Sequence, residues 1–483
     1  MTFYLHLISL LFLIRLVASL AIDTSNATYW FTQPVDHFSK SGLAQWKQQY
    51  IINATYYQPG GPVFLITPGE TPLSRYYADD THVTTLAQSL HALVVAVEHR
   101  FYGASNPTAD LSGASLKYLT IENVLEDFAS FIRALKSQPS EVFPELTVPG
   151  ESQVVFFGGS YAGNVAAWMR AEYPELIEGA WASSAVLYGR LLDYQYDQRF
   201  GAHLQKLGCG QCFAQAVSDL DQLLLSNDPQ KLLAAQQKFG IPALSAPDTA
   251  ALISALVSAT ANEPISQAGD PMMPAVCMFF NTSSCLDGYA AATNAAIQMM
   301  GLLPQHLLIM GNSSLALDYD ALGQVPRVWY YQMCSWFGGW QVPPPLKLKL
   351  TAYRSQLLDQ NYWQGNCQKK FGPDVAVPVD VEGYNRKWFN ALKGVSNIYY
   401  TAGELEIWRD STVVAQGSVL GGIGSGSQIR LIEGANHGQD IQAENDLDLD
   451  TVKEARHVGN KLVRRWLKLR TSHEPRSCRY VDI

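Results

Sequence analysis

Short apolar runs alternate with stretches of helical periodicity through the first part of the chain. Segments 61–69 and 91–103 each hold an apolar run of strand length that stops at glycine or polar residues. Segment 121–138 repeats apolar residues at helical spacing, and 152–177 predicts a strand, a tight glycine turn and a helix. A further strand is predicted within 178–187. Strands that alternate with helices indicate the α/β class, with a mostly parallel sheet.

The pattern changes in the middle of the chain. Segments 214–238 and 248–260 have helical spacing, and most of the cysteines lie in this part of the sequence. We therefore predict a helical insertion at 188–345. Strand patterns return at 396–403 and 427–440.

The predicted organisation is an α/β domain in two parts, 22–187 and 346–483, on either side of the insertion. Its last element is a helix at 450–469 with one apolar stripe. The lysines and arginines of this helix are expected on a solvated face.

The first residues predict entry into the secretory pathway. Residues 1–21 form an apolar stretch that ends in Ser19-Leu20-Ala21, a pattern typical of signal-peptide cleavage. A membrane anchor is the alternative, but the segment is short for a spanning helix and Arg15 interrupts it. No later segment is long and apolar enough to span a bilayer. We expect a secreted or vacuolar/lysosomal glycoprotein, with four sequons at Asn26, Asn53, Asn281 and Asn312.

Cysteine usage fits an oxidising compartment. The chain has seven cysteines, of which six lie between Cys209 and Cys367 and the last is Cys478. Cys209 and Cys212 are spaced like half of a zinc site, but no second ligand pair is evident. We therefore predict disulfides concentrated in one region. Their connectivity stays open, and the odd count leaves one thiol free or paired with another chain.

Composition excludes some classes of protein. The 483 residues are 47% hydrophobic and 16% charged, which is typical of a globular protein and not of a disordered one. The formal net charge of −9 argues against nucleic acid as a partner.

The strongest candidate chemistry lies in the sequence GGSYA at 158–162, which nearly fits the G-x-S-x-G nucleophile elbow. A strand that turns sharply into a helix needs small side chains two residues before and after the serine, and Gly158 and Ala162 meet that need. Ser160 would then project over the sheet edge, and the backbone N–H of Tyr161 could donate to an oxyanion. The alternative is a glycine-rich turn in which the serine only caps a helix.

A nucleophilic serine needs a base and an orienting carboxylate. His437 lies in a loop between the last predicted strand and the last helix, which fits the order serine, acid, histidine of α/β-hydrolases. His99 precedes Ser160, and we interpret it with Glu98 and Arg100 as a structural cluster. The acid is expected in GELEIWRD at 403–410, directly after a predicted buried strand.

Eight stretches in order resemble the S28 family of serine peptidases, which includes prolylcarboxypeptidase, dipeptidyl peptidase II and fungal prolyl endopeptidases. They are FTQPVDHF (31–38), GGPVFLITPGE (60–70), VVAVEHRFYGAS (94–105), LKYLTIENVLED (116–127), FFGGSYAGNVAAW (156–168), WYYQMCSW (329–336), GELEIWRDSTV (403–413) and EGANH (433–437). The resemblance implies an α/β-hydrolase fold interrupted by a helical, disulfide-bearing cap. It also implies Ser160 as nucleophile and His437 as base. Acyl transfer from a peptide substrate by these residues would need no metal or cofactor.

The acid loop departs from the family's pattern of glycine, one residue, an apolar residue, aspartate, proline and tryptophan. Glu406 stands on the aspartate and Ile407 on the proline, which loosens the turn. Glu406 is our preferred acid, Asp410 is the rival, and Glu404 is expected to face solvent. Trp408 is retained and is expected to wall an apolar substrate slot, with simple core packing as the alternative.

Two further departures concern the oxyanion loop and the specificity pocket. PGETP replaces the usual Gly-Gly-Glu-Gly, so that Gly69 is expected to help supply a second oxyanion donor. Asn164 stands where relatives often carry an apolar residue, which puts strict proline specificity in doubt.

The favoured function is an exopeptidase-type serine peptidase that acts through an acyl-enzyme. The alternatives are an esterase or lipase with the same triad, and a non-catalytic hydrolase-like protein with a decayed triad. The sequence leaves open whether cleavage is at a carboxyl end, near an amino end or internal. It also leaves homodimer formation open.

Overall fold

The computed structural model describes residues 27–39, 44–137, 142, 148, 150–262, 276–281, 284–299, 324–373, 375, 378–416 and 424–468. The predicted signal peptide, the sequons at Asn26 and Asn312, and Cys478 lie outside the described residues.

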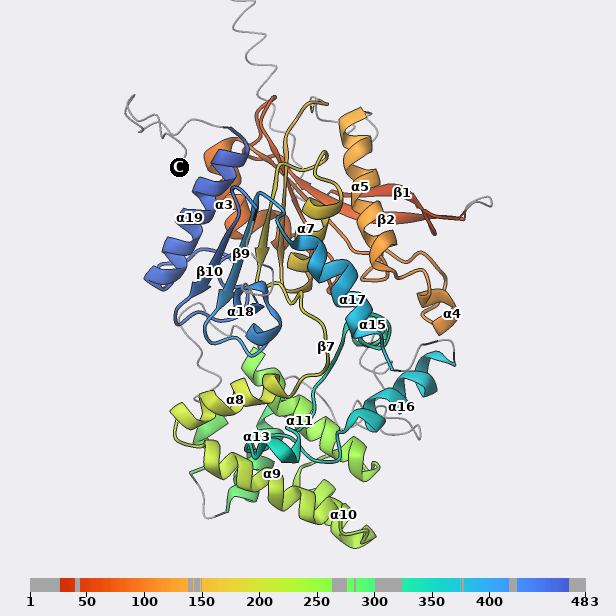
Figure 1. Ribbon diagram of the computed structural model, residues 1–483, viewed down its shortest axis with the longest axis vertical. Coiled ribbons are helices and arrows are strands. Elements are labelled where there is room, and N and C mark those ends of the chain that lie inside the picture. Colours follow the sequence, from red (N-terminus) through yellow and green to blue (C-terminus); the bar gives the residue numbers. More distant parts are fainter. Residues whose placement is uncertain are drawn as a thin grey trace, which may run out of the picture.

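An eight-stranded mixed sheet lies in the upper part of the molecule as drawn in Figure 1, with helices on both sides. In spatial order the strands are β1 (Thr28–Pro34), β2 (Gln45–Asn53), β4 (Leu93–Val97), β3 (Val63–Ile66), β5 (Val154–Gly159), β6 (Gly179–Ser183), β9 (Ile398–Gly403) and β10 (Gln428–Ile432). The six strands from β4 to β10 run parallel, as predicted, and β1 and β2 add an antiparallel hairpin at one edge. This hairpin was not among the predicted elements.

Both faces of the central parallel strands are buried, because β3, β4 and β5 consist of apolar residues and glycine. In the edge strand β10 only Ile432 is buried. Val154 and Phe156 of β5 point into one core, and Val155 and Phe157 point into the other. The first core is covered by α5 (Ile121–Ser137), α7 (Tyr161–Glu172), α15 (Gln324–Gln332), α16 (Gln360–Phe371) and α17 (Val381–Tyr384). The second is covered by α2 (Tyr76–Asp79), α3 (His82–Leu90) and α19 (Asp450–Trp466). Two short helices, α4 (Gly113–Leu116) and α18 (Val413–Gln416), lie in connecting segments.

A group of helices follows the sheet strand β6 in the chain and gathers beyond one end of the sheet (Figure 1). We call them the cap helices: α8 (Tyr194–Lys206), α9 (Gly210–Leu224), α10 (Pro229–Lys238), α11 (Ala246–Asn262) and α13 (Cys285–Met299). They enclose a separate apolar core, which also takes in Tyr353, Leu358 and Ile407. Before them, β7 (Arg190–Leu192) pairs in parallel with β8 (Gly338–Trp340). The boundaries 188 and 345 predicted for the insertion stay a prediction.

Disulfides join the cap helices, as the cysteine clustering predicts. Cys209–Cys277 and Cys212–Cys285 tie the start of α9 to the segment before α13 and to its first residue. A third bond, Cys334–Cys367, links the turn after α15 to α16. The helical pattern of 214–238 divides into α9 and α10, because Asp228 caps a new helix that begins at Pro229.

The last helix, α19, buries the predicted apolar stripe, which includes Val452, Ala455, Leu462 and Trp466. One basic residue departs from the expected solvated face. Arg456 is 4% exposed and donates to the backbone oxygens of 439 and 440, and it forms an ion pair with Asp448. Within the described residues, no helix is both long and apolar enough to cross a membrane.

Candidate active site

Ser160 occupies a sharp turn between β5 and α7. Its φ of 56° and ψ of −130° are strained for a residue with a side chain. A Cβ on Gly158 would lie 2.1 Å from the backbone oxygen of Ala162, so the turn needs glycine there. The local backbone therefore has the geometry expected of a nucleophile elbow.

The loop after β3 packs against this turn. Gly69 has a φ of +70°, and a Cβ there would lie 3.0 Å from the Cβ of Ala162. The backbone N–H of Gly69 donates to Thr67 Oγ1 at 3.3 Å. The expected oxyanion loop thus lies beside α7, while the donor roles of Gly69 and Tyr161 remain predictions.

His437 and Glu406 come together from the loops after β10 and β9. Glu406 is 3% exposed, and its Oε2 shares a hydrogen bond with His437 Nδ1. Burial of the ring would lower the pKa of His437. The charge of Glu406 and its hydrogen bond, with smaller contributions from Glu70 and Asp440, instead raise that pKa above its ordinary value.

The rival acid, Asp410, faces a different partner. Its carboxylate binds the Arg199 guanidinium through two hydrogen bonds of 2.6 and 2.8 Å. Burial alone would raise the pKa of Asp410, but Arg199 lowers it below its ordinary value. Glu404, expected in solvent, is partly buried and accepts from the backbone N–H of Gly434 at 3.0 Å. The contacts of this loop therefore favour Glu406 as the partner of His437.

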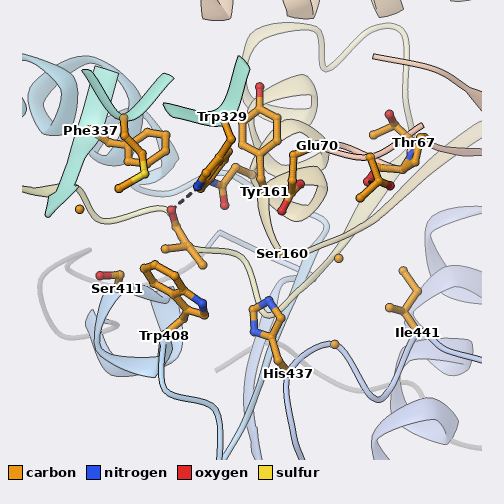
Figure 2. A pocket seen from close by; sticks show the side chains of 18 of the residues that line it. Thr67, Glu70, Ser160, Tyr161, Trp329, Phe337, Trp408, Ser411, His437 and Ile441 are labelled. Atoms are coloured by element: carbon orange, nitrogen blue, oxygen red, sulfur yellow. Dashed lines mark hydrogen bonds between the residues drawn. The ribbon is translucent and has the colours of Figure 1, made fainter. Parts of the chain in front are cut away.

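Ser160 and His437 line one cavity of about 520 Å³. Figure 2 shows Trp329, Phe337, Trp408 and Ser411 together on one side of Ser160, with Thr67 and Ile441 on the other. Trp408 lines the cavity, and its role as a wall of a substrate slot stays a prediction. Its ring packs edge-on against Tyr196 of the cap helices, with 4.7 Å between the two ring centroids. The cavity also reaches two charged residues, Arg190 and Asp193.

A family model described as serine carboxypeptidase S28 matches residues 33–458. The chain belongs to the S28 family of serine peptidases. It is 27% identical over 479 residues to the serine protease vicPb of Bipolaris victoriae. The aligned region covers 90% of this chain and 88% of that relative. It is 26% identical over 465 residues to the thymus-specific serine protease of Mus musculus, covering 91% and 87% of the two chains. It is 25% identical over 495 residues to a probable extracellular serine carboxypeptidase of Arthroderma benhamiae, covering 90% and 67%.

The family assignment confirms three predictions made from sequence. The chain is a serine-type peptidase, its substrates are peptides, and its fold is an α/β-hydrolase sheet with disulfide-linked helices.

Glu70 is a site residue to which no role was assigned from the sequence. In this S28 peptidase its side chain lines the cavity together with Ser160 and His437. Burial raises the pKa of Glu70 to about 7, against the opposing effects of its own backbone N–H, the His437 charge and Ser160. Its place directly after Gly69 was the available signal.

The cluster around His99 is structural, as predicted, but its pairs differ from the expectation. Arg100 binds Asp127 with two hydrogen bonds of 2.6 and 2.8 Å, not Glu98. His99 Nε2 shares a 2.9 Å hydrogen bond with the hydroxyl of Tyr161, and burial lowers the pKa of His99 to about 4. The S28 peptidase therefore holds the Tyr161 ring with a neutral imidazole.

Asp440, three residues after His437, holds the histidine loop in place. This role was not predicted from the sequence. It is 1% exposed and accepts hydrogen bonds from Trp181 at 2.9 Å and from Thr401 at 2.7 Å. It also accepts from Ser183 at 2.5 Å. These contacts fasten the histidine loop to β6 and β9. The motif HGQD carried the only signal for this role.

Two sequons fall within the described residues, and their glycosylation stays a prediction. Asn281 is exposed. Asn53 is 7% exposed, and its amide nitrogen donates to the backbone oxygen of Ala78 and to Asp79. A glycan on Asn53 would have to replace those contacts, so Asn281 is the better acceptor of the two.

Proposed function

We propose that this S28 peptidase cleaves peptides with a triad of Ser160, His437 and Glu406. The observation that carries the proposal is the hydrogen bond between buried Glu406 and His437 beside the strained turn of Ser160. Ser160, His437, Glu406 and Glu70 all follow parallel strands of one sheet, at their carboxyl ends.

In the proposed mechanism His437 takes the proton of Ser160, whose oxygen attacks the carbonyl carbon of the scissile peptide bond. The oxyanion is held by the backbone N–H of Tyr161 and by a donor from the loop at Gly69. His437 then protonates the leaving amine, and water hydrolyses the acyl-enzyme. Glu406 keeps Nδ1 of the imidazole protonated and stabilises its charged form.

We further propose an exopeptidase mode. The cavity is walled by Trp408 on one side, and its lining includes Arg190 and Asp193. Asp193 is buried, and burial raises its pKa to about 6. A charged peptide end could pair with one of these two residues, whereas an internal segment has no charged end to offer.

We also propose that the protein acts in the secretory pathway or outside the cell. Three disulfides in the described residues support this address, because such bonds persist in oxidising compartments.

The test compares the purified protein with its Ser160→Ala variant on a diverse peptide mixture between about pH 4 and 8, a span across which a histidine base titrates. Mass spectrometry of the products identifies the cut positions. Cleavage by the parent protein alone, at chain ends, is the expected result. Ester hydrolysis without peptide cleavage, or equal activity of the variant, would contradict the proposal.

A further inference from the structure

The Asn164 side chain is an unusual polar group in the wall of the active-site cavity. It lies on α7 four residues after Ser160, which is about one helical turn. Its backbone N–H donates to the backbone carbonyl oxygen of Ser160 at 3.3 Å. The side chain is 2% exposed and lines the same cavity as Ser160 and His437.

Only half of the Asn164 amide is paired. Its Nδ2 donates to the backbone oxygen of Val186 at 2.8 Å. A carbonyl oxygen can only accept, so this bond fixes which end of the amide is nitrogen. Oδ1 is therefore the opposite atom of the amide, and it is buried with no hydrogen-bond partner among the residues that the structure describes.

The surroundings of Asn164 in the cavity are mainly apolar. Trp329, Met333, Phe337 and Trp408 line the same space. An unpaired acceptor in such a wall costs free energy unless a bound molecule donates to it. A fully apolar substrate side chain would leave Oδ1 unpaired, whereas one that adds a single donor to an apolar body would satisfy both parts of the wall.

We propose that Asn164 is a specificity-determining residue that selects a substrate side chain carrying a hydroxyl or N–H donor. The selected residue is the one whose carbonyl Ser160 attacks, called P1. This inference rests on the proposed peptidase function and narrows its substrate class. Proline and the aliphatic residues are poorer P1 residues than their hydroxylated counterparts, because they have no donor for Oδ1.

The test uses three pairs of peptides that differ at P1 by one hydroxyl group: threonine and valine, tyrosine and phenylalanine, hydroxyproline and proline. For the pair whose shape fits the cavity, kcat/KM should favour the hydroxylated member at least about tenfold, the lower range of the penalty for one unpaired buried acceptor. In Asn164→Leu, which keeps a similar volume without the acceptor, the ratio should fall to about one or reverse.

Met333→Leu is the matched control, since Met333 lines the same cavity as Asn164 and the substitution changes no polar hydrogen-bonding group. It should alter kcat/KM for both members of a pair by the same factor. Preference for the apolar member in all three pairs would overturn the inference, and so would a ratio that survives Asn164→Leu.

A second readout separates this inference from the proposed function. Calorimetric titration of the same peptides into Ser160→Ala measures binding without cleavage. If the parent cleaves no peptide, the proposed function fails. The inference then stands only if Ser160→Ala binds the hydroxylated member more tightly, and it fails if the two members bind equally.

Discussion

Ser160 and Glu406 lie in the same site but are held in place in different ways. Ser160 is fixed by its immediate neighbours, because the turn between β5 and α7 leaves no room for a side chain at Gly158. Glu406 lies on a loop whose next residue, Ile407, is 2% exposed and packs into the core of the cap helices. Residues adjacent in the sequence thus fix the position of the nucleophile, whereas the position of the acid depends on the apolar core of the cap helices.

The comparison explains why the loop tolerates the loss of the family's proline. A proline would restrict the backbone of this turn through its fixed φ. Ile407 instead holds the loop by burial of its side chain among the cap helices, in contact with the core that also includes Tyr353 and Leu358. Tertiary packing of the Ile407 side chain thus restrains the loop in place of a fixed backbone angle. The packing therefore does not indicate the loosened turn that was expected from the sequence.

The largest expected effect separates the two candidate acids. Glu406→Gln should lower kcat by about 10³- to 10⁴-fold, because the amide cannot stabilise the imidazolium and favours the wrong tautomer. Asp410→Asn, the matched control, removes the charge that pairs with Arg199 and should lower kcat by less than about tenfold. Steady-state kinetics of both variants decide the matter, and the reverse order of effects would transfer the role to Asp410.

A smaller but still large effect tests the local restraint on Ser160. Gly158→Ala places a Cβ 2.1 Å from the backbone oxygen of Ala162 and should displace the elbow, lowering kcat/KM about 100-fold or more. Gly159→Ala is the matched control, since its Cβ meets only the Cγ2 of Ile441 at 3.4 Å. Equal losses in the two variants would show that the space at Gly158 does not set the nucleophile.

The dependence of the acid on the cap helices is tested at Ile407. Ile407→Ala should cost about 2–5 kcal/mol of unfolding free energy, and it should lower kcat about tenfold because the Glu406 loop loses its anchor. Leu233→Ala, at a 48% exposed position of α10, should change the unfolding free energy by less than about 0.5 kcal/mol. Denaturant titration and kinetics are measured together. A stability loss with unchanged kcat would disconnect the acid from the cap.

The smallest expected effect is a shift in pH dependence. The base must be neutral, so activity falls as the pH drops through the pKa of His437, which the nearby carboxylates raise above its ordinary value. Glu70→Gln removes one of these charges and should move the acid limb of kcat/KM to lower pH, by less than about 1 unit. Glu433→Gln, at an exposed position of the same histidine loop, should leave the limb in place. An acid limb that stays or moves upward in Glu70→Gln would contradict this assignment of charge.

Features with a local physical cause were predictable from the sequence. The parallel strands follow from continuous apolar runs such as β5, and the elbow follows from small residues around Ser160. The hairpin of β1 and β2 was missed because polar residues interrupt both strands, and only Tyr50 to Asn53 at the end of β2 are buried in an unbroken run.

Features that depend on distant partners were not predictable. Arg199 lies 211 positions from Asp410, and no sequence pattern near either residue predicts their pairing. Arg456 was expected in solvent, but it binds the loop that follows His437. The unpaired Oδ1 of Asn164 also required coordinates, because the sequence shows the amide but not the single carbonyl that it faces.

The adjacency of Glu406 and Ile407 has a consequence for the life of a newly made chain. The ribosome produces Ser160 and the cap helices before it produces either residue of this pair. If the proposed triad is correct, a copy whose disulfide-linked helices have not folded has no apolar core in which Ile407 can pack. Glu406 is then not held against the imidazole of His437. Such a copy carries the nucleophile but is a poor peptidase.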